Sequence, residues 1–165
     1  MAEIPVVSVV GKSDSGKTTL LEKLLREAKQ RGWRVATVKH DVHGFDMDKP
    51  GKDTWRHAQA GADVVVISSP QKIAILESVA EDQPLDAVLA RIQGVDLIFT
   101  EGYKHGNKPK IEVFRSAVHK ELLCQPEELI AIASDVTFDL GVPCYGLDDA
   151  AGICDLLERL YLKQA

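Results

Sequence analysis

Residues 4–32 read IPVVSVVGKSDSGKTTLLEKLLREAKQRG, and this stretch decides the fold. It begins with an apolar run rich in valine over residues 4–10, which is typical of a strand buried on both faces. Leucines and an alanine then recur at helical spacing up to Ala28, and Gly32 stands where a left-handed helix C-cap belongs. The stretch therefore predicts a strand, a loop and a helix, in that order.

The loop between this strand and this helix carries the phosphate-binding pattern G-x-x-x-x-G-K-[ST]. Its residues are Gly11, Lys12, Ser13, Asp14, Ser15, Gly16, Lys17 and Thr18. Successive backbone N–H groups and the helix N-terminus favour bound oxyanions. We expect Lys17 to reach the β- and γ-phosphates of a nucleoside triphosphate and Thr18 to bind Mg²⁺ through its hydroxyl. Thr19 could contact the α-phosphate.

Strand and helix patterns alternate along the rest of the chain. We expect strands over residues 33–38, 62–68, 73–76, 95–99, 111–114, 129–133 and 142–145, and helices over 53–60, 84–92 and 149–162. This order predicts an α/β fold, a single three-layer P-loop domain over residues 1–165 with a mainly parallel sheet and helices on both faces. Residues 72–76 and 111–114 follow the preceding strand too closely for a crossover helix, so we expect some antiparallel pairing there.

Composition limits the class of protein. The chain has 165 residues, of which 45% are hydrophobic, and a formal net charge of -5. This balance suits an ordinary globular core and argues against broad binding of nucleic acid or anionic membranes. No apolar stretch approaches the roughly 20 residues that span a bilayer, and no secretory signal is recognisable, so we expect a cytoplasmic protein. The cysteines Cys124, Cys144 and Cys154 form no Cys-x-x-Cys pair and are expected to be reduced.

Two acidic residues follow predicted strands, at the edge where ligands of open α/β sheets bind. Asp41 comes after the strand expected over residues 33–38, and Glu101 after the one expected over 95–99. One or both could hold Mg²⁺, directly or through water, or orient an attacking water. With Lys17, they are the candidate catalytic residues. The sequence does not separate their roles, and each could instead be a solvated loop acid or a helix cap.

A third acid, Asp135, follows the strand expected over residues 129–133 and bears on the choice of base. A carboxylate can accept hydrogen bonds from both N1–H and the exocyclic amine of guanine, whereas adenine offers an acceptor at N1. Asp135 therefore favours GTP over ATP. The alternative is an aspartate that only shapes a turn.

Together with the phosphate-binding loop, several further motifs resemble those of the MobB family, the molybdopterin-guanine dinucleotide biosynthesis adapter proteins. This family lies within the SIMIBI class of P-loop proteins, which includes the nickel-insertion GTPases. The motifs run through nearly the whole chain: Val38-Lys39-His40-Asp41, Lys49-Pro50-Gly51-Lys52-Asp53, Arg56 with Ala60-Gly61-Ala62, Thr100-Glu101-Gly102-Tyr103-Lys104, and residues 131–135.

The resemblance implies a GTP-binding protein, usually dimeric, that helps a nucleotidyltransferase of the MobA type attach GMP to molybdopterin, with slow GTP hydrolysis at most. It places Asp41 and Glu101 near Mg²⁺ and turns Asp135 toward guanine. It also implies a second functional patch at Asp53 and Arg56. Lys104 could add positive charge there for a pterin phosphate or an acidic partner, although such residues could also be a helix cap and solvated charges.

Lys12 occupies the position of a signature lysine of the wider class, which in some relatives crosses the dimer interface to reach phosphate. A contact of Lys12 across a dimer is therefore a hypothesis. Two other functions stay open: a small-molecule kinase, which usually carries an arginine-bearing lid, and a metallochaperone GTPase, which should carry a cluster of Cys or His ligands. Neither feature stands out in the sequence.

Overall fold

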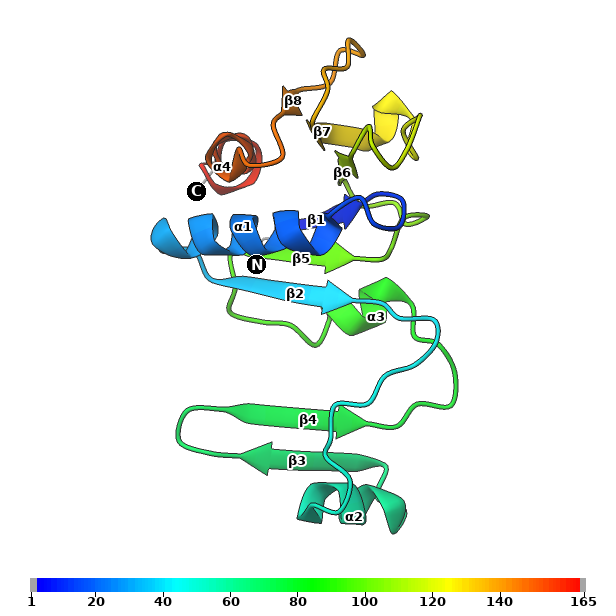
Figure 1. Cartoon of the computed structure of the whole chain (residues 1–165). Helices are drawn as coiled ribbons and strands as arrows, with labels where there is room; N and C mark the ends of the chain where they lie inside the picture. The colour runs from blue at the N-terminus through cyan, green and yellow to red at the C-terminus, as the bar shows by residue number, and fades with distance from the viewer. Residues whose placement is uncertain (1–2, 164–165) are drawn as a thin grey trace. The chain divides into compact units, whose positions relative to one another are not determined.

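The computed structural model describes residues 3–163 (Figure 1). The chain divides into two compact units. Residues 1–40 and 93–165 form the first, which we call the sheet unit, and residues 41–92 form the second, which we call the hairpin unit. This division does not test the prediction of a single domain over residues 1–165, which stays a prediction.

The sheet unit is built on a six-stranded sheet of order β2-β5-β1-β6-β7-β8. The strands are β1 (Val6–Val10), β2 (Val35–Lys39), β5 (Leu97–Glu101), β6 (Lys110–Phe114), β7 (Leu129–Ser134) and β8 (Cys144–Tyr145). Every neighbouring pair is parallel. The predicted parallel sheet is thus confirmed, and the carboxyl ends of its strands share one edge.

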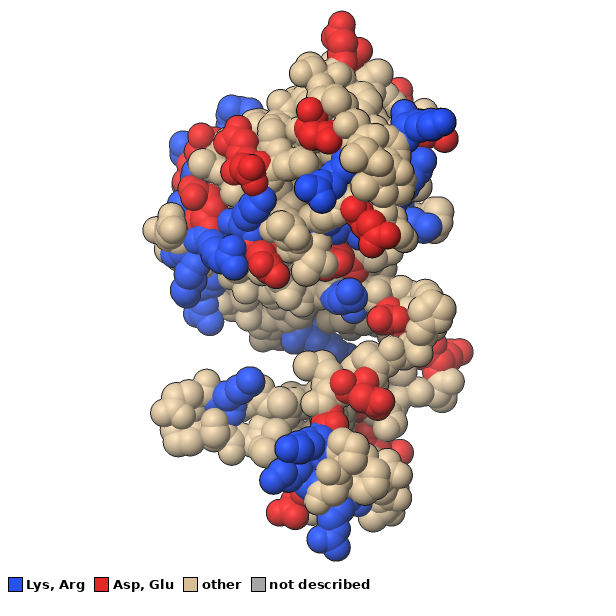
Figure 2. All heavy atoms as spheres, in the orientation of Figure 1, with Lys and Arg blue, Asp and Glu red and all other residues tan. Residues whose placement is uncertain are grey.

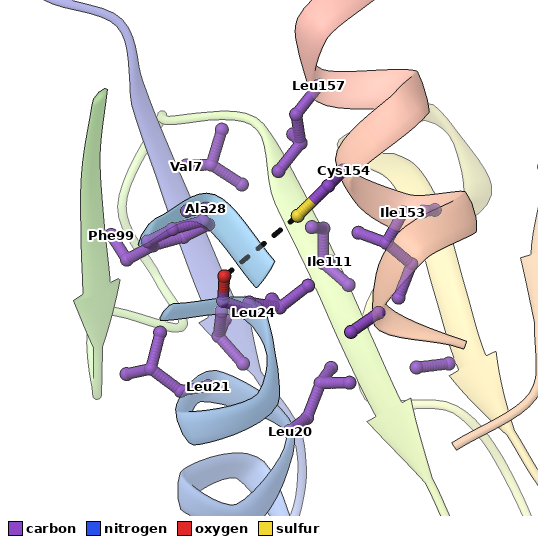
Figure 3. Close-up of a cluster of buried hydrophobic side chains, with 14 of the residues drawn as sticks. Val7, Leu20, Leu21, Leu24, Ala28, Phe99, Ile111, Ile153, Cys154 and Leu157 are labelled. Carbon is purple, nitrogen blue, oxygen red and sulfur yellow. Dashed lines mark hydrogen bonds between the residues drawn. The ribbon is translucent and has the colours of Figure 1, made fainter. Parts of the chain in front are cut away.

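Two helices pack together over one face of this sheet (Figure 3). They are α1 (Lys17–Gln30) and α4 (Ala150–Leu157), and α4 continues as a short π-helix, η2 (Glu158–Leu162). Leu24 of α1 and Ile153 of α4 are fully buried, and the Cys154 thiol donates to the Leu24 carbonyl at 3.9 Å. We expected helices on both faces. Within the sheet unit, α1 and α4 share one face, while residues 122–124 and 136–142 cover part of the other around Ile132.

The direction of β6 corrects one prediction. We expected antiparallel pairing for residues 111–114, but β6 pairs in parallel with both β1 and β7. Thr100 near the end of β5 and Lys110 at the start of β6 are both paired with Ser8 of β1. Strand β6 therefore begins level with the carboxyl end of β5, and the turns of residues 102–109 only have to cross over β1. A short connection without a crossover helix can thus join two parallel strands, because the second strand is shifted along the sheet.

The hairpin unit contains β3 (Val64–Ser68) and β4 (Ile73–Glu77), which pair antiparallel as expected for residues 72–76. Helix α2 (Asp53–Gln59) packs against β3, and α3 (Leu85–Leu89) is shorter than the helix expected over residues 84–92. Val66 and Ile75 face each other across the ladder and are 57% and 64% exposed. Neighbouring Val64 and Ile73 are exposed too. The hairpin thus carries an uncovered apolar face.

Charge is mixed on the surface. On the side shown in Figure 2, lysine and arginine side chains lie among aspartate and glutamate side chains. In residues 3–163, no helix is long and apolar enough to cross a membrane. The three cysteines are free; Cys124 and Cys154 are buried and Cys144 is half-buried. Burial raises the pKa of the Cys124 thiol to about 11 and that of Cys154 to about 12.

The remaining 3₁₀ turn, η1 (Pro126–Glu128), leads into β7. Beside it, Lys110 is almost fully buried and donates hydrogen bonds to the Gly106 carbonyl and to Glu128 Oε1, at 2.6 and 3.1 Å. These bonds satisfy a charge that would otherwise be costly to bury. They lie at the amino ends of β6 and β7, away from the edge that carries the phosphate-binding loop.

Candidate functional site

The phosphate-binding loop joins β1 to α1, as the sequence predicts. Its backbone is tightly packed at Gly11, where φ is 155°. A Cβ atom on Gly11 would lie 2.6 Å from Ser15 Oγ and 2.6 Å from the Val113 carbonyl oxygen. Only glycine fits there, because a side chain would have to displace backbone. The loop backbone at Gly11 therefore packs closely against the Val113 carbonyl of β6.

Two polar groups of the loop are placed for an anion. The Lys17 ammonium lies over the loop and donates to the carbonyls of Gly11 and Lys12, at 3.0 and 3.1 Å. The Ser15 hydroxyl is buried and has no hydrogen-bond partner among the residues that the structure describes. Its side chain packs beneath Gly11. The loop therefore combines a cation with a hydroxyl donor that no described protein group uses, which fits a bound phosphate chain.

Thr18 and Glu101 come together at the start of α1. The Thr18 hydroxyl donates to Glu101 Oε1 at 2.8 Å, and the Lys39 ammonium lies 3.8 Å from the same oxygen. Glu101 is only 9% exposed. A hydroxyl and a carboxylate oxygen in contact beside a phosphate loop are ligands that suit Mg²⁺. The structure thus brings together two of the three residues for which we predicted a metal role.

Asp41, the third of these residues, is the first residue of the hairpin unit. It is exposed, and its carboxylate accepts a hydrogen bond from the His43 backbone N–H at 3.0 Å. This is the local turn contact expected of a loop aspartate. A role of Asp41 at the metal or in catalysis stays a prediction.

A cavity of about 500 Å³ opens over the loop. It is lined by Val10, Gly11, Lys12, Ser13, Lys17, Gly102, Lys104, His119 and Leu123. The three lysines give it the positive charge that a polyphosphate requires. Lys104, which we expected to serve a partner patch, lines this cavity, and its role in such a patch stays a prediction.

Residues 115–124, which follow β6, are fastened to the loop by two contacts. The His119 Nε2–H donates to the Ser13 carbonyl at 2.7 Å, and the Lys12 ammonium lies 3.8 Å from Glu121 Oε1. The Lys12 side chain thus has an acidic partner within its own chain. Sequence reasoning missed His119 and Glu121, because the expected antiparallel direction of residues 111–114 placed the segment at the opposite edge of the sheet.

A buried carboxylate holds the far end of this segment. Glu112 of β6 is only 1% exposed, and it accepts hydrogen bonds from the backbone N–H groups of Leu123 and Cys124. Such charge-assisted bonds are among the stronger ones in proteins. Residues 115–124 are therefore held at both ends beside the phosphate-binding loop.

Asp135 follows β7 and binds the turn that follows β6. Its Oδ1 accepts from the Ser116 backbone N–H at 2.8 Å, and its Oδ2 from the Ser116 hydroxyl at 3.0 Å. The Ser116 backbone N–H is the main cause that lowers the pKa of Asp135. Each carboxylate oxygen keeps lone-pair capacity, so a contact of Asp135 with guanine stays a prediction.

Asp53 and Arg56 lie on α2 of the hairpin unit, whereas Lys104 belongs to the sheet unit. The grouping of the three into one patch stays a prediction. The structure corrects one detail: Lys52 is the N-cap of α2, and Asp53 is its first helical residue. An acid in the first turn still interacts favourably with the helix dipole, which explains why the pattern resembles a cap.

The chain matches the family model of Molybdopterin guanine dinucleotide synthesis protein B over residues 6–135. It is 36% identical to a molybdopterin-guanine dinucleotide biosynthesis adapter protein of Escherichia coli (strain K12), covering 98% of this chain and 95% of that protein. A protein of the same description from Haemophilus influenzae (strain ATCC 51907 / DSM 11121 / KW20 / Rd) is 33% identical, covering 95% of this chain and 89% of the relative.

Solved structures agree. The crystal structure of a molybdopterin-guanine biosynthesis protein B aligns with a TM-score of 0.74 at 32% identity, covering 94% of this chain and 98% of that one. A structure of Bacillus subtilis MobB aligns with a TM-score of 0.69 at 27% identity, covering 94% and 97%. Since the family model spans most of the chain and the relatives match almost end to end, the chain belongs to the MobB family.

Proposed function

We propose that this chain is a GTP-binding adapter. It assists a nucleotidyltransferase of the MobA type in attaching GMP to molybdopterin, which forms the guanine dinucleotide form of the molybdenum cofactor. The observation that carries the proposal is the contact of Thr18 with Glu101 beside the phosphate-binding loop, in a chain of the MobB family. The role is also supported by the relatives from Escherichia coli and Haemophilus influenzae, which are biosynthesis adapter proteins.

In this proposal the loop from Gly11 to Thr18 binds the phosphates of Mg-GTP. Lys17 exchanges its bonds to the Gly11 and Lys12 carbonyls for bonds to phosphate oxygens. Thr18 and Glu101 would hold Mg²⁺, directly or through water, and bound Mg²⁺ would neutralise part of the phosphate charge. Thr19 contacts the α-phosphate. A role of Asp41 at the metal is part of the same proposal.

Hydrolysis is slow at most in this proposal, and Lys17, Asp41 and Glu101 are the residues that would contribute to it. Glu101 is engaged by both Thr18 and Lys39, which suits a group that holds a metal better than one that takes a proton from water. The molybdopterin or the partner enzyme is proposed to meet the positive charge of Arg56 and its neighbours. Activity in the cytoplasm, without binding to nucleic acid or membranes, stays a prediction.

The same proposal includes a homodimer. It is supported by the apolar face of the hairpin unit, which consists of Val64, Val66, Ile73 and Ile75. A second copy of the chain would cover this face. Lys12 has an acidic neighbour in its own chain, Glu121, so a contact across the dimer would require that pair to open.

A reconstituted assay tests the adapter role. Mg-GTP, molybdopterin and a MobA-type enzyme are combined with or without this chain, and the guanylylated pterin is quantified by chromatography. We expect a several-fold faster product formation with the wild type and none of that gain with Lys17→Ala. Binding of GTP without any stimulation would contradict the adapter role. Stoichiometric nickel binding would favour a metallochaperone, and rapid phosphate transfer to a small acceptor would favour a kinase.

A further inference from the structure

A second, smaller cavity of about 120 Å³ lies on the sheet unit beside the phosphate-binding loop. It is lined by Ser15, Gly16, Thr19, Leu20, Lys23, Arg115, Leu147 and Asp148. The cavity shares the phosphate-binding segment with the larger cavity, but the lysines that line the larger one are absent from this lining set. The two cavities therefore differ in the chemistry they offer.

From this geometry we infer that the smaller cavity is the nucleoside compartment and that Arg115 is the wall against which the base lies. The inference rests on the proposed binding of GTP. The larger cavity, with Lys12, Lys17 and Lys104, suits the phosphates. Thr19, the expected contact of the α-phosphate, lines the smaller one. The nucleoside is attached to the α-phosphate, so it continues into the cavity that Thr19 lines.

The position of Arg115 suits a flat ligand. Its Cδ lies 3.9 Å from where a Cβ of Gly16 would stand, so the side chain runs beside the start of α1. A guanidinium is planar and stacks on aromatic rings, which a lysine ammonium does not do. Leu147 supplies an apolar surface to the same cavity. Every purine base presents a π-face on which such groups can pack, whichever hydrogen-bonding groups its edge carries.

The positive charge of Arg115 interacts with two carboxylates on other loops, Asp135 and Asp148. The pKa of Asp148 is lowered mainly by its hydrogen bond with Lys23, and the Arg115 charge contributes. The pKa of Asp135 is lowered mainly by the Ser116 backbone N–H, again with a contribution from Arg115. The guanidinium thus lies within electrostatic range of acids that follow β7 and β8.

Asp135 is then a positioning residue. It binds both the backbone N–H and the hydroxyl of Ser116, the residue next to Arg115. These bonds fix the turn from which the Arg115 side chain departs. Loss of the Asp135 carboxylate is expected to act on the nucleoside through Arg115, and not through a hydrogen bond of its own to guanine.

Calorimetry with two probes separates these roles. Mg-GTP and Mg-tripolyphosphate are titrated into the wild type, Arg115→Ala and Arg115→Lys, with Arg26→Ala as a control that removes the same charge from an exposed position on α1. We expect Arg115→Ala to weaken GTP binding about tenfold and to leave tripolyphosphate binding unchanged within about twofold. We expect Arg115→Lys to recover little of the lost GTP affinity, because lysine keeps the charge but lacks the planar guanidinium. Arg26→Ala resembles the wild type.

A double-mutant cycle tests the positioning role. Asp135→Ala alone should weaken GTP binding several-fold, but should add little in the Arg115→Ala background, because both changes remove one contact. Additive losses would show that Asp135 contacts the base itself. Equal losses for GTP and tripolyphosphate, or a GTP affinity of Arg115→Ala equal to that of the wild type, would overturn the nucleoside compartment. A wild type that binds neither probe would instead refute the proposed GTP binding.

Discussion

The sheet unit buries the apolar residues of its central strands, whereas the hairpin unit leaves most of its apolar strand residues exposed. Strands β1, β5 and β6 are buried along their whole length, whereas β3 buries only Val65. Val9 of β1 is fully buried, but Ile75 of β4 is 64% exposed. A two-stranded hairpin is marginally stable in water by itself. The sheet unit therefore carries its own core, while the hairpin unit displays a surface suited to association.

The largest effect should come from truncating the core of the sheet unit. Leu24→Ala removes a fully buried side chain between α1 and α4, and we expect a loss of roughly 2–5 kcal/mol in the free energy of unfolding. Ile75→Ala, on the exposed face of the hairpin, should change it by less than about 0.5 kcal/mol at low protein concentration. Urea unfolding followed by circular dichroism compares the two. Similar losses would remove the contrast between the units.

Nucleotide binding should depend strongly on the sheet unit. Lys17→Ala removes the ammonium over the loop, and we expect GTP affinity to fall about 100-fold because charge-assisted bonds to phosphate are lost. Lys29→Ala on the exposed last turn of α1 and Lys72→Ala in the hairpin turn are matched charge controls. Calorimetry with Mg-GTP measures all three. A comparable loss in Lys72→Ala would show that the hairpin unit shares phosphate binding.

Association should depend on the hairpin unit. Ile75→Lys places a charge on the apolar face, and we expect the dimer dissociation constant to rise about tenfold or more, because a charge would have to be buried. Analytical ultracentrifugation over a dilution series measures it. Lys72→Glu, at the exposed hairpin turn, is the control for a changed charge. An unchanged mass distribution in Ile75→Lys would count against a dimer formed through this face.

The smallest effect concerns Asp135 and pH. Hydrogen bonds from Ser116 lower the pKa of this carboxyl in the folded chain, so its contribution to stability is present above the unfolded pKa of about 3.9 and is lost as pH falls through the folded value. We expect Asp135→Asn to lower the unfolding temperature by about 1–2 °C at pH 7 and by less below pH 4. Differential scanning fluorimetry across pH follows this. A drop in unfolding temperature on Asp135→Asn that grows as the pH falls would contradict this expected pH dependence.

The sequence predicted those parts of the site in which one local pattern fixes the geometry. The phosphate-binding loop follows from its glycines and Lys17, because strand, turn and helix all constrain it. Glu101 could be placed because parallel strands end at one edge. Arg115 and His119 could not, since the length of a connection does not decide whether the next strand is parallel, and the direction of β6 decides where both residues lie.

In the hairpin unit, the sequence pattern also does not predict which strand residues are buried. Runs of valine and isoleucine such as residues 64–67 predict a strand equally well whether or not anything covers it. The exposed Val66 and Ile75 become recognisable only when the fold shows which face α2 covers. Similarly, Asp53 resembles a cap in the sequence, and only the backbone identifies Lys52 as the residue at that position.

The bonds of Glu112 to the backbone of Leu123 and Cys124 have a mechanical consequence. They close residues 112–124 into a ring whose base is a strand of the sheet and whose far side touches Ser13 through His119. The segment is thereby held at its far end by bonds to a strand of the sheet and near its middle by a bond to the phosphate-binding loop. Releasing it from the sheet would leave the buried Glu112 carboxylate without these two donors, which is costly.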